Sequence, residues 1–176
     1  DDAGLEALFA ECGLASLEGP AARSLGCSTR CVLPLHRAVG GYGFHADEAR
    51  LLRTLDVLIR RGADLKAVDS TGETVLHKAA ALAAPSVAVN VANFLLDRGA
   101  DVDLGNANGN GPLHAEILRL RQASPAIVQL LLSHGADTSR QNADGKTPKD
   151  LLRRRPPFEA AADEVLHRLR AAARGS

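Results

Sequence analysis

Three similar stretches of the chain decide the fold: GADLKAVDSTGETVLHKAA (62–80), GADVDLGNANGNGPLHAEI (99–117) and GADTSRQNADGKTPKDLLR (135–153). Their first glycines, Gly62, Gly99 and Gly135, are 37 and 36 residues apart. A histidine stands 15 residues after the first and second of these glycines, and an aspartate stands 15 residues after the third. A spacing that is kept over three copies indicates an array of stacked repeats.

Each copy contains the signals of a turn followed by a short helix. An apolar run, LLRTLDVLIRR, VANFLLDR or IVQLLLSH, precedes each first glycine, which fits the glycine that ends a helix. A second glycine, Gly72, Gly109 or Gly145, follows a run of Asp, Asn, Ser, Thr and Ala, as in a tight turn. Caps and helix starts are predicted at Thr74, Thr147, Pro112 and Pro148. The repeated unit is therefore a turn, a short helix, a loop and a longer helix, and such a unit buries its apolar face only against neighbouring units.

This pattern resembles the ankyrin repeat. The TPLH motif of that family appears as LPLH (33–36), TVLH (74–77), GPLH (111–114) and, in altered form, TPKD (147–150). The resemblance covers about residues 31–152 and implies an all-α ankyrin-repeat solenoid of stacked helix-loop-helix units with hairpin connections. The expected divisions are an N-terminal capping helix with an irregular segment, three repeats, and a C-terminal capping repeat: 1–30, 31–68, 69–105, 106–141 and 142–176.

The units are longer than the family's usual length of about 33 residues, and the extra residues fall between the two helices of a unit. In the second and third complete repeats, Pro85 and Pro125 predict the start of the longer helix. The first repeat carries a larger insertion, GGYGFHADEARLL (40–52), without a phosphate-loop motif. Its aromatic residues, Tyr42 and Phe44, either pack on the first helix pair or contact a partner, and we predict partner contact.

The histidines His36, His77 and His114 occupy the same place in each unit, which favours a structural hydrogen-bonding role over catalysis or metal binding. Asp64, Asp101 and Asp137 follow helix ends, where short polar side chains accept hydrogen bonds from turn amides. A zinc site formed by Cys12, Cys27 and Cys31 with His36 is the alternative, but the spacing fits no common zinc motif. The sequence therefore predicts no catalytic residues, no metal and no cofactor.

The composition also restricts the kind of partner and the location. Lys plus Arg number 21 and Asp plus Glu number 21, so the formal charge is zero, which argues against non-specific binding to nucleic acid or to an anionic membrane. Three cysteines do not form a disulfide framework, so we expect an intracellular protein of the cytoplasm or nucleus. We expect a monomer or a component of a hetero-complex.

The resemblance implies a non-catalytic module that binds a protein or peptide on the concave face made by hairpin tips and short inner helices. The mixture of charged and amide residues expected on this face suits a polar peptide. The alternative is a regulatory or targeting domain of a larger enzyme or of a chromatin or signalling protein. The predicted partner-binding residues are Arg37, Tyr42, Phe44, Ser70, Thr71, Glu73, Lys78, Asn108, Asn110, Arg119, Asp144 and Lys146.

Overall fold

The computed structural model describes residues 34–40, 48–119, 124–153, 167 and 171. Several sequence predictions lie outside these residues: the N-terminal capping segment, the three cysteines, the aromatic residues Tyr42 and Phe44, and most of the C-terminal capping helix. Those predictions stay untested.

The described chain folds into paired helices. In each of the three complete repeats a short inner helix precedes a longer outer helix, as the repeat pattern predicts, and the structure describes the inner helix of the C-terminal repeat. The inner helices are α2 (Pro34–Gly40), α4 (Val75–Ala80), α6 (Pro112–Leu118) and α8 (Pro148–Arg153). The outer helices are α3 (Glu48–Arg60), α5 (Pro85–Asp97) and α7 (Pro125–Ser133).

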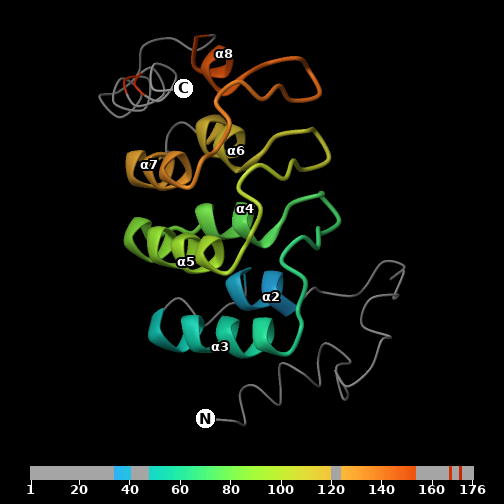
Figure 1. Cartoon of the computed structure of the whole chain (residues 1–176), viewed down its shortest axis with the longest axis vertical. Coiled ribbons are helices and arrows are strands. Elements are labelled where there is room, and N and C mark those ends of the chain that lie inside the picture. The colour runs from blue at the N-terminus through green and yellow to red at the C-terminus, as the bar shows by residue number, and fades with distance from the viewer. Residues whose placement is uncertain (1–33, 41–47, 120–123, 154–166, 168–170, 172–176) are drawn as a thin grey trace.

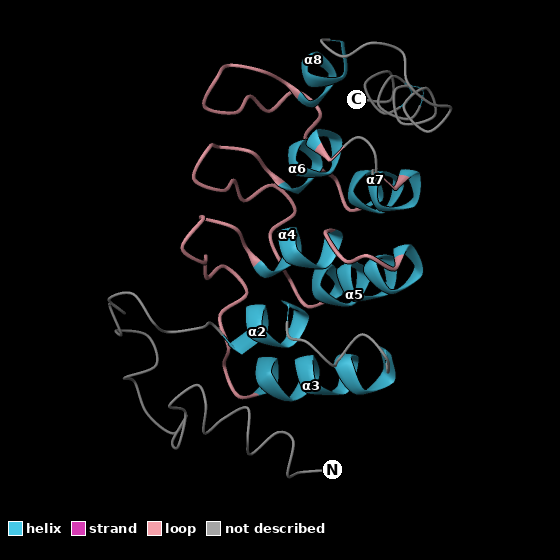
Figure 2. Cartoon of the chain, turned by 180° about the vertical axis from the view of Figure 1, so that it is seen from behind, coloured by secondary structure: helices cyan, strands magenta, loops and turns pink. Residues whose placement is uncertain are grey.

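The pairs stack along one axis, and the loops that join one unit to the next project to the same side (Figure 1). The reverse view shows the same row of loops beside the helices (Figure 2). We call these loops the first hairpin (69–73), the second hairpin (106–110) and the third hairpin (142–146). Within the described ranges, the extended pairing consists of a single antiparallel bridge between Val68 and Thr74. The all-α solenoid is therefore confirmed.

Aliphatic side chains between stacked units form the core. Leu51, Leu55 and Leu58 of α3 are fully buried, and Leu95 of α5 and Leu131 of α7 lie in the same kind of position in the next units. Burial of a leucine side chain contributes about 1.5–3 kcal/mol, so this layer supplies the main favourable free energy of stacking. The buried hydrophobic residues in the described part of the chain are leucine, valine, isoleucine and alanine.

The local signals in the sequence also act as predicted. Gly72, Gly109 and Gly145 have φ of 76°, 70° and 70°, and the glycines that end the helices are also left-handed. Extended residues precede Pro85 and Pro125, each of which starts an outer helix. Thr74 caps α4 through its side chain.

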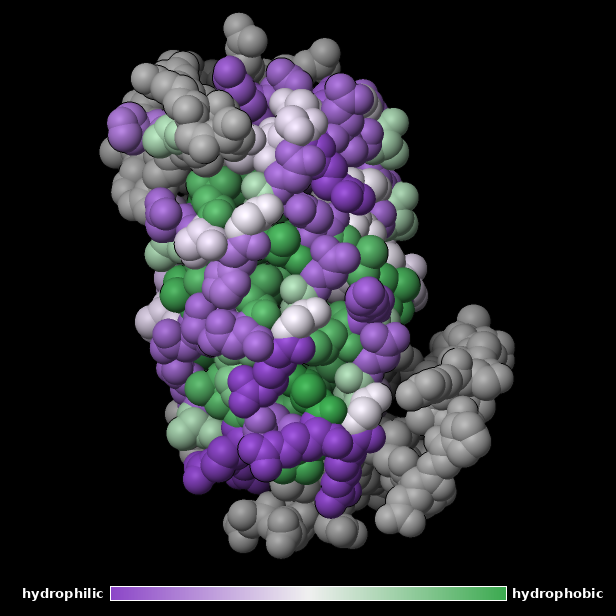
Figure 3. Space-filling view, viewed as in Figure 1, coloured by the Kyte–Doolittle hydropathy of each residue, from purple (hydrophilic) through white to green (hydrophobic). Residues whose placement is uncertain are grey.

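The surface of the stack mixes residue types. In the view of Figure 3, hydrophobic and hydrophilic residues interleave over the helices, and hydrophilic residues gather over α3. Arg50, Arg53 and Arg60 are exposed on that helix. In the described part of the chain no helix is long and apolar enough to cross a membrane.

Candidate protein-binding surface

The repeated histidines connect each unit to the next. The Nε2 atom of His77 lies 2.9 Å from the backbone oxygen of Asn110, across the boundary between the second and third units. His36 makes the same contact with Glu73 at 2.7 Å, and His114 makes it with Lys146 at 3.2 Å. The structural role predicted for the histidines is confirmed, because each side chain fixes the hairpin of the following unit.

The geometry around His77 requires a neutral ring. Its Nδ1 atom accepts a hydrogen bond from the backbone N–H of Thr74, which leaves Nε2 to donate to Asn110. Burial lowers the pKa of His36, His77 and His114, although the contacts with backbone oxygens act in the opposite direction. His77 therefore uses both ring nitrogens in hydrogen bonds within the protein.

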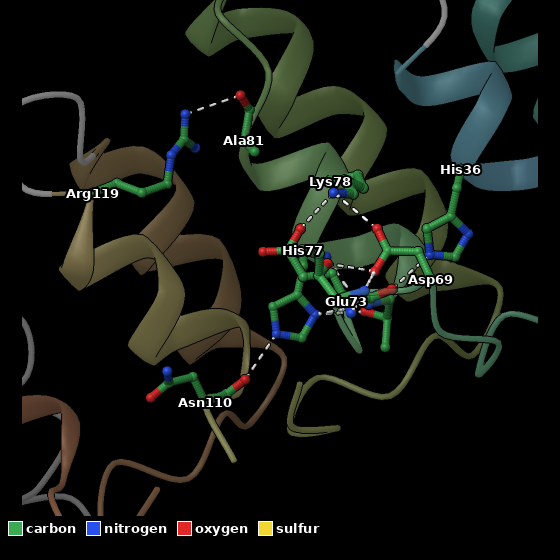
Figure 4. Close-up of polar contacts among 10 residues, drawn as sticks. His36, Asp69, Glu73, His77, Lys78, Ala81, Asn110 and Arg119 are labelled. Carbon is green, nitrogen blue, oxygen red and sulfur yellow. Dashed lines mark hydrogen bonds and ion pairs between the residues drawn. The ribbon is translucent and has the colours of Figure 1, made fainter. Parts of the chain in front are cut away.

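An ion-pair cluster lies where the first hairpin meets α4 (Figure 4). The Nζ atom of Lys78 is 3.0 Å from Oδ2 of Asp69 and 2.6 Å from Oε2 of Glu73. Burial alone would raise the pKa of Asp69, but hydrogen bonds from Thr71 and Lys78 outweigh it and hold the pKa far below its usual value. Burial acts to lower the pKa of Lys78, but its hydrogen bonds with Glu73 and Asp69 raise it overall. Lys78 therefore stabilises two carboxylates at once, and the cluster keeps one net negative charge.

The aspartates beside the helix ends accept hydrogen bonds from turn amides, as the sequence predicts. Oδ1 of Asp64 accepts from the Lys66 N–H at 2.8 Å. Asp101 and Asp137 accept in the same way from Asp103 and Ser139. These carboxylates stabilise the turns that follow the helices.

Asn110 differs from its predicted place on an open surface. It is only 7 % exposed. Its backbone oxygen receives the His77 contact, and its side-chain Oδ1 accepts a hydrogen bond from Nδ2 of Asn142 at 2.8 Å. Asn110 therefore joins the second hairpin to the third, and its contact with a partner stays a prediction.

Arg119 also has a structural role that the sequence does not reveal. Its guanidinium donates to the backbone oxygen of Ala80 at 2.7 Å. It also donates to the backbone oxygen of Ala81 at 2.9 Å, at the end of α4 (Figure 4). It also lies 3.6 Å from Oε2 of Glu116. The side chain therefore satisfies carbonyl groups that a helix end leaves without intrahelical partners.

Glu116 is a buried carboxylate that the sequence analysis does not identify. It is 1 % exposed, and its Oε1 accepts a hydrogen bond from the N–H of Ser124 at 2.6 Å, at the start of α7. Burial raises its pKa, while the Ser124 bond and Arg119 act in the opposite direction. One signal marks it in the sequence: the corresponding positions in the first and second units are Ala38 and Ala79.

We call the surface made by the three hairpins and the exposed sides of the inner helices the hairpin face. Of the predicted partner-binding residues, Arg37, Ser70, Thr71, Asn108 and Asp144 are exposed. Glu73, Lys78, Arg119 and Lys146 are partly exposed. The second and third hairpins are held together by a hydrogen bond from the Ala143 N–H to the Asn108 backbone oxygen at 3.0 Å.

Among the described residues, no group of three or more His, Cys, Asp or Glu side chains is placed to hold a metal ion. Three of the four residues of the alternative zinc site, the cysteines, lie outside the described ranges, so that alternative stays untested.

The paired helices, the glycine-ended hairpins and the bridging histidines define a solenoid repeat protein. A family model described as ankyrin repeats, in three copies, matches residues 35–142. The chain therefore belongs to the ankyrin-repeat family. Ankyrin repeats are protein–protein interaction modules without a catalytic site of their own.

Proteins with similar sequences are much longer than this chain. The chain is 32 % identical over 157 residues to the Neurogenic locus Notch protein of Drosophila melanogaster, which covers 88 % of this chain and 5 % of that protein. It is 42 % identical over 74 residues to human Ankyrin repeat and SOCS box protein 9, covering 42 % of this chain and 23 % of that protein. The chain thus spans less than a quarter of either relative.

A solved structure has the same fold. The ankyrin repeat domain of Bcl-3, a member of the IkappaB protein family, matches with a TM-score of 0.56 and 26 % sequence identity. The match covers 76 % of this chain and 50 % of that one.

Proposed function

We propose that the chain binds a segment of another protein on its hairpin face and acts as an adaptor or recruitment domain. The hairpin face corresponds to the concave face that the family resemblance implies. The partner is a protein or peptide, and the binding site includes the exposed tips of the three hairpins. The proposed location is intracellular.

One observation carries this proposal: the framework of the hairpins repeats, whereas their exposed residues do not. The inter-unit histidine contacts are the same at three boundaries. The exposed tip positions, in contrast, read Ser70–Thr71, Ala107–Asn108 and Ala143–Asp144. A rigid scaffold with variable exposed residues suits recognition, because the binding side chains are held in place before the partner arrives.

The alternative is a regulatory or targeting domain within a larger enzyme or a chromatin or signalling protein. The chain matches only 5 % of one relative and 23 % of the other, so in both of them the similar region is one part of a larger protein. This supports the alternative as a second candidate. In that case the bound segment belongs to the same polypeptide or to the same complex.

Site-specific photo-cross-linking tests the proposed face. A photoreactive residue is placed at Ser70 or Asn108 on the hairpin face, and, as a control, at Ala126 on the outer helix α7, where the side chain is also exposed. We expect the same protein adduct from both hairpin positions and none from position 126. Adducts formed only from the control position would contradict the proposed face, and an adduct within a longer form of the same polypeptide would favour the alternative.

A further inference from the structure

The chemistry of the hairpin face changes along the array. At the first hairpin, Lys78 is paired with both Asp69 and Glu73. At the third hairpin, Nζ of Lys146 is 3.2 Å from Oδ2 of Asp144. The pair at the third hairpin is neutral, whereas the cluster at the first hairpin, one lysine with two carboxylates, keeps one net negative charge.

The second hairpin, between these two pairs, carries no charged side chain. Residues 106–110 read Asn-Ala-Asn-Gly-Asn. Asn108 is exposed at the tip, and its backbone is fixed on both sides: its N–H donates to Oδ1 of Asn106 at 3.0 Å, and its oxygen accepts from Ala143 at 3.0 Å. An amide on a rigid tip offers both a donor and an acceptor to a partner.

The inner helix of the same unit adds an apolar contact. Leu118 of α6 is 37 % exposed, one of two large hydrophobic side chains that are exposed in the described part of the chain. Ala115 on the same helix is partly exposed, and Ala81 at the end of α4 is exposed. The guanidinium of the adjacent Arg119 lies near Glu116 and donates hydrogen bonds to the carbonyl groups of Ala80 and Ala81.

We propose that the third unit binds a stretch of a partner protein that is uncharged where it crosses the second hairpin, with an apolar side chain against Leu118 and a polar uncharged group on the amide of Asn108. This proposal rests on the proposed function and specifies the partner of the same face. A charged partner residue at this place would lose water without meeting an uncompensated opposite charge, which is unfavourable. The mixture of charges in the sequence suggests a polar peptide instead, but the second hairpin itself offers no charge to a partner.

A peptide selection provides the test. The full 176-residue chain is used as bait for a phage-displayed library of random 12-residue peptides, and the enriched peptides are synthesised. We expect enriched peptides with an apolar residue inside an uncharged run, and affinities that change less than about twofold between low and high salt, because no exposed ion pair is formed.

Variants that differ only in charge locate the contact. L118E and N108D are expected to weaken binding of such a peptide by about tenfold or more, while L118Q weakens it less and A126E, on the outer helix, leaves it unchanged. Asn108 is exposed, but Leu118 is only 37 % exposed, so melting temperatures are measured beside the affinities, and L118Q reports the loss that follows from removing the leucine alone. Equal losses for L118E and L118Q would overturn the charge argument.

Other outcomes separate this proposal from the proposed function. Selected peptides that are rich in charged residues, bind in a salt-dependent way and cross-link to Asn108 would overturn the uncharged partner but keep the face. Peptides that bind independently of every hairpin-face variant would contradict the face itself. Concentration-dependent self-association that L118E abolishes would assign the face to a second copy of the chain, which also overturns the proposal.

Discussion

His77 shows how one side chain serves two units. Within its own unit it completes the cap of α4 with Thr74, and across the boundary it contacts the backbone oxygen of Asn110. Removing the ring takes one of two hydrogen bonds from that oxygen, which still accepts from the Asn106 N–H, and it leaves the Thr74 N–H without its acceptor.

We therefore expect His77→Ala to lower the free energy of unfolding by about 1–3 kcal/mol, the cost of a lost buried hydrogen bond. His134→Ala is the matched control, because His134 is exposed and its Nε2 atom lies 3.3 Å from Oδ1 of Asn93 on the outer side. That change should stay within about 0.5 kcal/mol. Denaturant unfolding of both variants measures the difference, and a variant that keeps its stability but loses partner binding would make His77 a contact residue.

The same histidines predict how stability depends on pH. Burial lowers their pKa values, so the folded protein keeps them neutral while the unfolded chain binds protons below about pH 6.5. The stability that they contribute is present above about pH 6.5 and is lost as the pH falls through the lower pKa of the folded state.

We expect the wild-type protein to lose stability between pH 7.5 and pH 5, and His77→Gln to show a shallower loss over the same range, because one titrating group is gone. Glu116, whose pKa is raised by burial, contributes in the opposite direction, but it is common to both proteins. Unfolding curves at the two pH values provide the measurement, and identical slopes would rule out a lowered pKa at position 77.

At the scale of elements, much of the fold was predictable because its signals are local. A glycine that permits positive φ, a proline that starts a helix and a threonine that caps one each act through their own backbone. Gly72, Pro85, Pro125 and Thr74 therefore have the conformations that the sequence predicts.

The side-chain roles that depend on the neighbouring unit were harder to predict. Asn110 was expected to be exposed, but it is buried because the third hairpin packs against it through Asn142. Arg119 reaches back to α4 of the preceding unit. Glu116 acts within its own unit, where it accepts a hydrogen bond at the start of α7. The sequence spacing identifies the unit but does not specify which side chains cross its boundary.

The hairpin glycines offer a prediction with an internal control. A Cβ atom on Gly109 would lie 2.7 Å from the backbone nitrogen of Ala143, and one on Gly72 would lie 2.4 Å from that of Ala107. A Cβ atom on Gly145 meets nothing within 4 Å. The three residues have similar positive φ values, so the close approach of the next hairpin is the main difference.

We expect Gly145→Ala to cost about 1–2 kcal/mol, the strain of a left-handed alanine. Gly109→Ala should cost clearly more, because it also moves Ala143 and breaks its hydrogen bond to Asn108. Melting temperatures of the two variants test this difference. If the two variants lose the same stability, the contact between the second and third hairpins contributes little to the stability of the fold.

Across the whole molecule, each unit contacts its neighbours, so the free energy of the array should be close to a sum over boundaries. His36 lies at the first boundary and His114 at the third, and their acceptors, the backbone oxygens of Glu73 and Lys146, are different. Arg119 and Glu116, by contrast, contact each other. Arg119 reaches α4 of the preceding unit, and Glu116 reaches the start of α7 in its own unit.

We therefore expect the losses of His36→Ala and His114→Ala to add within about 0.5 kcal/mol in the double variant, since the two sites share no partner. For Arg119→Ala and Glu116→Ala we expect a coupling of about 0.5–3 kcal/mol, because removing Arg119 alone leaves a buried carboxylate without its cation, and removing both relieves that cost. Two double-mutant cycles, measured by denaturant unfolding at pH 7.5, compare the pairs. Strong coupling between His36 and His114 would mean that the boundaries do not act independently, and that strain at one end of the hairpin face reaches the other.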